Sequence, residues 1–187
     1  QRIPDIPINV KYSFKNGSHL QAGAVLRNMY YKDEVEDKDR IVTGWGASLS
    51  GIWQFAENTS LCFQGVYGKG ISNYIQDISG SGLDLVPSTT AEGELKAFCA
   101  WGGYIGFSHN WNKVLTSNIM YSYARALDRY GMPATSYKYA QYAAANLFWD
   151  FSEYGSCAIE YVFGRRNDFN KDYGNASRIN TMIQYRF

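Results

Sequence analysis

The sequence predicts an all-β protein, an antiparallel transmembrane β-barrel with long strands, and three observations lead to this fold class. Apolar and polar residues alternate over long segments, which is the pattern of strands with one apolar and one polar face. Aromatic residues make up 17% of the 187 residues, and an excess of Tyr and Trp is typical of membrane–water interfaces. Short turns alternate with longer polar loops. Residues 1–187 are predicted to form one barrel domain.

The alternation is clearest at the C-terminal end. From 177 to 187 the odd positions hold Ser, Ile, Thr, Ile, Tyr and Phe, whereas the even positions hold Arg, Asn, Met, Gln and Arg. Residues 157–166 and 143–151 repeat the pattern in the same phase. The apolar set is assigned to lipid and the polar set to the lumen of a barrel.

The same alternation predicts about nine long strands, near residues 6–15, 19–32, 40–55, 59–76, 95–111, 114–129, 137–152, 156–168 and 176–187. A strand of about 10 residues rises roughly 33 Å and, when tilted by about 40°, crosses the apolar band of an outer membrane. Strands of soluble proteins are typically about half as long as the predicted ones. No apolar stretch approaches the ~20 residues of a membrane helix.

The connections between these strands are of two alternating kinds. Hairpin turns are predicted at Asn16-Gly17, 56–58, Asn112-Lys113 and 153–155, and longer polar loops at 33–39, 77–94, 130–136 and 169–175. Short turns at the periplasmic rim and long loops outside the cell are typical of a membrane barrel. The last strand then ends at the periplasmic rim with Phe187.

The strand count is odd, whereas bacterial single-chain barrels have an even number of strands. The first predicted strand also begins close to Gln1. We therefore expect the chain to be an incomplete portion of a larger even-stranded barrel, with N-terminal strands missing.

Composition and motifs argue against several other classes of protein. A net charge of +1 without a block of Lys and Arg gives no footprint for nucleic acid. The two histidines, His19 and His109, lie beside predicted turns, where no catalytic triad is supported, so no enzyme and no catalytic residue is predicted. The three cysteines are far apart and lack metal-ligand spacing, so neither a metal site nor a cofactor is predicted.

Charged residues of the lumen-facing set lean towards positive. Two interpretations stay open. The basic residues either pair with the acidic ones and stiffen the wall, or they favour anions in the pore. The basic pore-lining candidates for the anion path are Lys11, Arg27, Arg166, Arg178 and Arg186, and their acidic partners are Asp150 and Glu160.

Some positions allow two readings. Arg165 and Arg166 are adjacent and must point to opposite faces, so Arg165 is expected to reach the lipid headgroups or a lipopolysaccharide phosphate. The loop 77–94 contains apolar residues, and either folds inward to narrow the pore or packs on a neighbouring loop or subunit. The acidic run 33–39 is interpreted as a solvated loop tip rather than a cation site.

Several segments together resemble the DcaP-like porins. They are Arg2-Ile-Pro-Asp-Ile-Pro, Gly44-Trp-Gly-Ala-Ser-Leu-Ser-Gly, Gly65-Val-Tyr-Gly-Lys-Gly-Ile-Ser-Asn-Tyr-Ile, His109-Asn-Trp, Ile159-Glu-Tyr-Val-Phe-Gly-Arg-Arg-Asn-Asp-Phe, and Asn175-Ala-Ser-Arg-Ile-Asn through Gln184-Tyr-Arg-Phe. The resemblance covers nearly the whole chain. It implies a homotrimeric outer-membrane channel of a Gram-negative bacterium that admits small anionic solutes such as dicarboxylates, and a full-length member with additional strands.

The functional hypothesis is a porin for passive diffusion of small hydrophilic, preferentially anionic solutes, in contact with membrane lipid and lipopolysaccharide and not with nucleic acid. Two alternatives stay open. One is a plugged structural or adhesive barrel with its function in the outer loops. The other is a soluble barrel that binds a small ligand inside, which would need the aromatic face to be buried.

Overall fold

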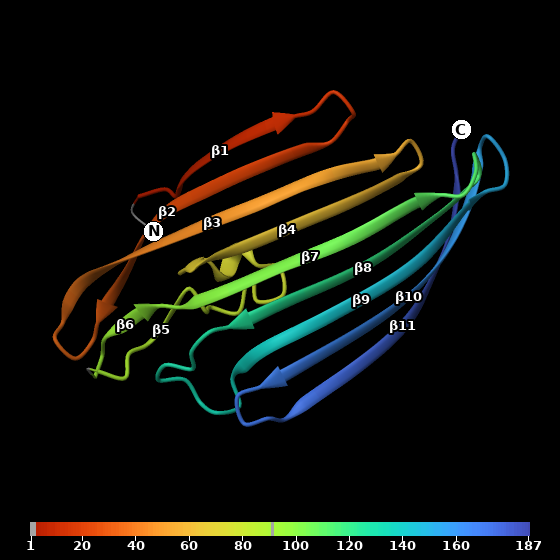
Figure 1. The fold of residues 1–187 in the computed structure, drawn as a ribbon. Coiled ribbons are helices and arrows are strands. Elements are labelled where there is room, and N and C mark those ends of the chain that lie inside the picture. Colours follow the sequence, from red (N-terminus) through yellow and green to blue (C-terminus); the bar gives the residue numbers. More distant parts are fainter. Residues whose placement is uncertain (1–2, 91) are drawn as a thin grey trace.

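A computed structural model of the protein describes residues 3–90 and 92–187 and is dominated by one large antiparallel sheet (Figure 1). Consecutive strands of this sheet are neighbours in space. In order they are β1 (Ile6–Ser13), β2 (His19–Asp33), β3 (Lys38–Ala56), β4 (Thr59–Lys69), β7 (Cys99–Asn110), β8 (Leu115–Ala126), β9 (Tyr137–Asp150), β10 (Gly155–Asp168) and β11 (Tyr173–Tyr185). The predicted all-β class and the nine long strands are confirmed. Arg2, where the segment Arg2-Ile-Pro begins, lies outside the described residues.

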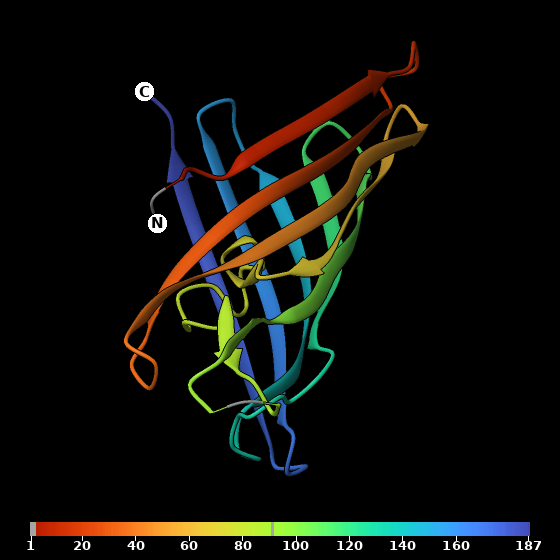
Figure 2. The same ribbon diagram turned by 90° about the vertical axis from the view of Figure 1, so that its left-hand side faces the viewer.

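The sheet curves into an open half-shell, seen from its side in Figure 2. Its edge strands are β1 and β11, and within the described residues they do not pair with each other. The short connections after β1, β3, β7 and β9 lie at one end of the strands, at the upper right of Figure 1, and the long ones lie at the other end. This is the arrangement of turns and loops predicted from the sequence. The fold is therefore that of an outer-membrane β-barrel wall.

Two strand boundaries differ from the prediction. The segment expected as one strand over 59–76 leaves the sheet after Lys69, because Gly70 has a φ of 68°, which favours glycine. A short 3₁₀ helix, η1 (Ser72–Tyr74), follows. The segment expected over 95–111 is divided: β6 (Leu95–Ala97) pairs with β5 (Leu85–Pro87) in a small second sheet, and β7 begins only at Cys99.

The described residues of 70–98 (70–90 and 92–98), named here the inward segment, lie on the concave side of the sheet (Figure 2). Part of loop 77–94 thus packs on the concave side, as the inward reading expects, and that it narrows the pore stays a prediction. The fully buried side chains Ile71 and Phe98, together with Ile75, Ile78 and Val86, form an apolar cluster with the wall. Wall residues of this cluster are small or aromatic, and they are Ala100, Ala124, Ala126 and Tyr137.

Small residues on the concave face make room for this cluster. A Cβ on Gly46 would lie 2.9 Å from Cγ2 of Ile71, and a Cβ on Gly102 would lie 3.1 Å from Cγ2 of Ile75. Both glycines therefore lie where the segment packs closely on the wall. The segment is therefore packed tightly against the wall instead of extending freely into the lumen.

Candidate functional site

The register of the strands decides which side chains share a face. Arg27 pairs with Gly44, Gly46 with Gly68, and Gly68 with Ala100, and side chains opposite each other across a ladder point to the same side of the sheet. Following these pairs from strand to strand separates the chain into a concave and a convex set. The residues that the alternation assigned to the lumen in β9, β10 and β11 belong to the concave set, as do Lys11 and Arg27.

The convex face is apolar and exposed. Its exposed large side chains include Ile8, Leu26, Leu49, Ile105, Ile119, Leu147, Ile159, Ile179 and Ile183. Exposure of so much apolar surface fits contact with lipid. It also overturns the alternative of a soluble ligand-binding barrel, because that alternative places the aromatic and aliphatic face inside.

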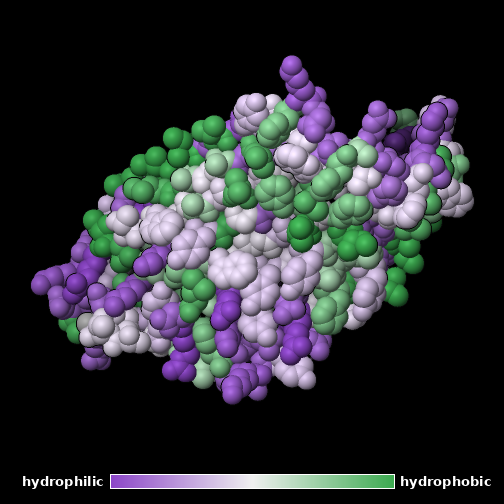
Figure 3. Space-filling model, in the orientation of Figure 1, coloured by the Kyte–Doolittle hydropathy of each residue, from purple (hydrophilic) through white to green (hydrophobic). Residues whose placement is uncertain are grey.

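Aromatic rings collect near both ends of the strands on the convex face. On the loop side, Trp101 and Tyr123 lie 5.1 Å apart between ring centroids, and Tyr123 and Tyr139 lie 5.5 Å apart. On the turn side, Trp149 contacts Phe151, and Tyr185 contacts Tyr154 and Phe187. In Figure 3, hydrophilic residues gather mainly beyond the two ends of the strands. Two aromatic girdles around an apolar band are the mark of a barrel in an outer membrane.

The most densely bonded group on the concave face surrounds Arg27. Its side chain is 6% exposed, and its Nε and Nη1 lie 2.9 Å from Oδ2 of Asp5 and of Asp84, respectively. Nη1 also donates to the carbonyl of Gly70. The guanidinium thus joins β2 to the N-terminal segment and to the inward segment.

The partners of Arg27 are themselves held by the inward segment. Asp84 accepts hydrogen bonds from Ser72 Oγ at 2.6 Å and from Asn73 Nδ2 at 2.9 Å. The Tyr74 hydroxyl donates to Asp5 at 2.7 Å, and the Tyr74 ring lies 5.3 Å from the Arg27 guanidinium. Burial, and then the hydrogen bond to Asp5, raises the pKa of Tyr74, so its hydroxyl stays a donor. We call these residues the Arg27 anchor: Asp5, Arg27, Ser72, Asn73, Tyr74 and Asp84.

Of the other basic candidates, Lys11, Arg166 and Arg178 belong to the concave set of the strands. Arg166, in register with Ala140, forms an ion pair of 2.9 Å with Asp168. Lys11, Arg178 and Arg186 are exposed, and within the described residues none of the three forms a salt bridge or a side-chain hydrogen bond. Arg186 follows the last residue of β11 and lies at the turn end. The candidates are spread over the face, and Arg166 and Arg178 lie on the neighbouring strands β10 and β11.

Within the described residues, neither acidic candidate forms a salt bridge with an arginine, although the charge of Arg178 acts on Glu160. Glu160 accepts hydrogen bonds from Asn180 Nδ2 at 2.9 Å and from Asn146 Nδ2 at 3.3 Å, while Arg178 is in register with Val162 and so lies one row further along. Asp150 is exposed near the turn end, in register with Ser156. In the described part of the chain, Glu160 is thus bound by two asparagines and interacts with Arg178 only through its charge.

Arg165 points to the opposite face from Arg166, as predicted. It lies over the Tyr173 ring at 4.4 Å and donates from Nε to Asn167 at 3.0 Å. Both aromatic and amide partners belong to the loop side of the convex face. This is the level at which lipid headgroups are met.

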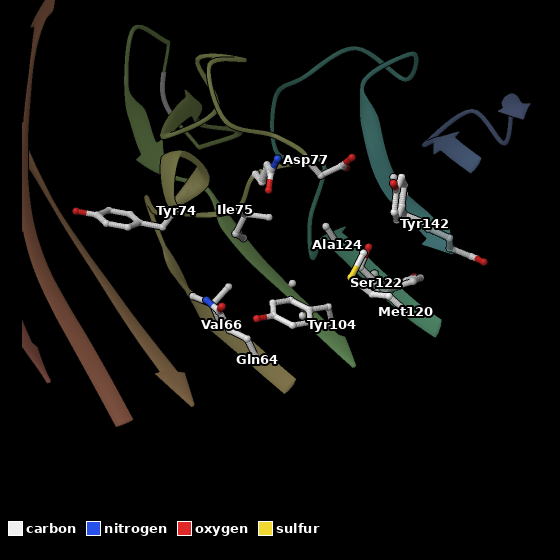
Figure 4. A pocket seen from close by; sticks show the side chains of 16 residues that line it. Gln64, Val66, Tyr74, Ile75, Asp77, Tyr104, Met120, Ser122, Ala124 and Tyr142 are labelled. Atoms are coloured by element: carbon white, nitrogen blue, oxygen red, sulfur yellow. The ribbon is translucent and has the colours of Figure 1, made fainter. Parts of the chain in front are cut away.

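A cavity of about 750 Å³ lies between the inward segment and the wall (Figure 4). Gln64 and Tyr104 line one side, Met120 and Ser122 lie between, and Tyr142 lies on the other side. The inward segment contributes Tyr74, Ile75, Gln76 and Asp77. Sequence reasoning missed the residues of the inward segment that line this cavity, and it missed the two carboxylates that bind Arg27. No local pattern connects Asp5 and Asp84 to Arg27.

Metal and disulfide chemistry have no support in this site. Within residues 3–90 and 92–187, no group of three His, Cys, Asp or Glu side chains is placed to hold a metal ion. The three cysteines, Cys62, Cys99 and Cys157, are free thiols.

No helix in the described part of the chain is long and apolar enough to cross a membrane.

Comparison with known families decides the identity of this wall. The family model described as DcaP outer membrane protein matches residues 1–187. The chain belongs to the DcaP outer membrane protein family. The family resemblance stated from the sequence is thereby confirmed, and with it localisation in the outer membrane of a Gram-negative bacterium.

One solved structure agrees with this assignment at the level of the fold. The outer membrane channel DcaP of Acinetobacter baumannii shares 19% identity with this DcaP-family chain at a TM-score of 0.80, over 100% of this chain and 52% of that one. The chain therefore spans about half the length of that channel. The NanC porin shares 12% identity at a TM-score of 0.48, over 98% of this chain and 93% of that one. No curated protein matches the sequence.

Proposed function

We propose that this DcaP-family chain forms part of the wall of a channel through which small hydrophilic solutes, preferentially anions such as dicarboxylates, diffuse passively across the outer membrane. The observation that carries the proposal is the sorting of side chains by face. The convex face is apolar with aromatic girdles, and the concave face presents amides, hydroxyls and charges. A polar inner face is what a water-filled pore needs. No bond is made or broken in this activity.

The preference for anions depends on basic side chains of the concave face that form no salt bridge within the described residues and can therefore attract solutes. Arg27 and Arg166 are neutralised locally by their acidic partners, whereas Arg178 and Lys11 are exposed on the concave face. Charges of one sign along a low-dielectric wall focus the field on passing ions. A guanidinium also binds a carboxylate in a bidentate manner. Arg178 is therefore the residue expected to weigh most in ion preference.

The test is the reversal potential of the native, detergent-extracted protein in a planar bilayer under a KCl gradient. We expect stepwise conductance with anion preference, which Arg178→Gln lowers strongly and Arg166→Gln lowers less. Arg165→Gln is the matched control, because this residue neighbours Arg166 but lies on the convex face. Equal shifts from Arg165→Gln and Arg178→Gln would contradict the assignment of the anion path.

The proposed channel needs further strands and further copies. Unpaired N–H and C=O groups at the edges β1 and β11 cannot remain in lipid, so we propose that additional strands close the wall. A homotrimer is proposed from the family resemblance, and contacts with lipid and lipopolysaccharide from the convex face and Arg165. Chemical crosslinking of the extracted native protein tests the trimer by the mass of the crosslinked species.

One observation favours the alternative of a plugged structural barrel, namely that the inward segment packs against the concave face. In that case the same bilayer experiment shows insertion of the protein without conductance. Removal of the packing that holds the segment would then open a conductance that the native protein lacks.

A further inference from the structure

We propose that the cavity between the inward segment and the wall is a subsite for an uncharged, polyhydroxylated solute of the sugar or polyol class. The proposal rests on the proposed function, because the solute reaches the cavity through the channel. It goes further in naming a class of solute that the lumen arginines do not select.

The cavity contains a row of neutral polar side chains built by the strand register. Gln64 is in register with Tyr104, Tyr104 with Ser122, and Ser122 with Tyr142. The row therefore crosses β4, β7, β8 and β9 on the concave face. Figure 4 shows Tyr104 with Gln64 on one side of the cavity and Tyr142 on the other. Four donors or acceptors thus face one space instead of being scattered along the wall.

The polar groups of these four side chains are free to bind a solute. Within the described residues, Gln64, Tyr104, Ser122 and Tyr142 make no side-chain hydrogen bond with the protein. By contrast, the polar row at the turn side is internally bonded, since Asn118 donates to Asn146 at 2.8 Å and Asn146 donates to Glu160. A hydroxyl or amide that is free in a recess can exchange its water for a solute hydroxyl.

The charge of the cavity disfavours an ion. No Lys or Arg lines it, and Asp77 is the one carboxylate among its lining residues. Asp77 already has a partner, because the Tyr137 hydroxyl lies within hydrogen-bond distance of its carboxylate and of the Ala124 carbonyl and shares its one proton between these two acceptors. An anion entering the cavity meets this carboxylate without a compensating cation. The lining therefore fits a neutral solute.

The remaining surface is aromatic and aliphatic. Tyr104 and Tyr142 present rings, and Met120, Val66 and Ile75 present apolar side chains. A sugar or polyol has C–H faces that pack on a ring and O–H edges that hydrogen-bond with hydroxyls and amides. A volume of about 750 Å³ lies within the range of small-molecule sites. Shape, charge and donor pattern thus point to the same class.

The experiment measures block of single-channel current by maltose in the native protein in a planar bilayer. We expect maltose to interrupt the current in a concentration-dependent manner. The double variant Tyr104→Phe, Ser122→Ala removes two hydroxyls with little change in volume, and we expect it to raise the half-blocking concentration about tenfold, as for the loss of two hydrogen bonds. Gln64→Ala is a second variant with an expected smaller loss. Tyr121→Phe, on the convex face of β8, is the control and leaves the block unchanged.

The outcomes separate the two proposals. Conductance steps that maltose does not interrupt would overturn the subsite and leave the channel standing. Stronger block by the cation spermidine, weakened by the same double variant, would overturn the neutral class. Absence of any conductance would overturn the proposed function itself. Variants that still give conductance steps are inserted and folded, so a loss of block in them reports on the cavity.

Discussion

Arg27 Nη1 lies 2.9 Å from Asp84 Oδ2, so a single ion pair ties the barrel wall at β2 to the segment folded against it. The pair lies in a protected place, with side chains 6% and 19% exposed. Its surroundings are completed by Asp5, Ser72 and Asn73. The position of the inward segment in the lumen therefore depends on a charge in the wall as well as on apolar packing.

Removal of this charge should loosen the inward segment. In Arg27→Met the carboxylates of Asp5 and Asp84 lose their cation, and breaking a buried pair costs about 3–5 kcal/mol. We expect faster proteolysis within residues 70–98 and noisier single-channel current. Arg178→Met is the control, because it removes an exposed arginine without an ion pair. Equal proteolysis rates in the two variants would show that the apolar cluster alone holds the segment.

The close packing of Ile71 on Gly46 gives a second test, of how tightly the inward segment fits the wall. A Cβ at Gly46 would lie 2.9 Å from Ile71 Cγ2 and 3.2 Å from Val25 Cγ1, so Gly46→Val should destabilise the fold by about 1–3 kcal/mol through overpacking. The thermal unfolding midpoint in detergent measures it. Gly65→Val is matched, since nothing lies within 4 Å of a Cβ there. A partial recovery of the unfolding midpoint in the double variant Gly46→Val, Ile71→Ala would show that the clash with Ile71 causes the destabilisation. No recovery would point to another cause.

Glu160 allows a test of ion preference with the opposite sign. Its carboxylate is held by Asn146 and Asn180, and glutamine can still accept a hydrogen bond at the same place. Glu160→Gln should therefore raise anion preference by removing a negative charge from the concave face. The reversal potential under a KCl gradient measures it. A shift towards cations would contradict the placement of Glu160 in the ion path.

The faces themselves are testable with one substitution on each of two adjacent residues. Ile159 is exposed on the convex face, and near the bilayer midplane Ile159→Lys should lower the free energy of unfolding by about 2–4 kcal/mol. Ala158→Lys, on the concave face, should lower it much less because the ammonium group meets water. Denaturant unfolding from lipid vesicles compares the two. Similar costs would mean that the convex face does not contact lipid.

Periodicity predicted most of the strands, and it predicted the faces of β9, β10 and β11. The alternation in β10 and β11 placed Arg166 and Arg178 on the concave face and Ile159 and Ile179 on the convex one, because a period of two leaves one choice per strand. It failed at the end of β4. Ile71 and Ile75 continue the alternation of the strand, but the chain turns at Gly70, and these side chains pack on the inner wall instead.

The Arg27 anchor was beyond the reach of sequence reasoning for a different physical reason. Its carboxylates come from the segment before β1 and from the inward segment, so no local spacing relates them to Arg27. The neutral row of the cavity was likewise invisible, because register between strands, and not distance along the chain, makes neighbours of Gln64, Tyr104 and Ser122.

The inward segment starts and finishes at neighbouring strands, and Gly70 N–H donates to the Phe98 carbonyl at 2.7 Å where it leaves and rejoins the wall. Both ends are therefore pinned at one point, so insertions or deletions between them leave the pairing of β4 with β7 untouched. A change of length within the segment can therefore alter what covers the concave face while the order of the strands stays the same. The residues that face the wall, among them Ile71 and Asp84, are the part of the segment that has to be kept.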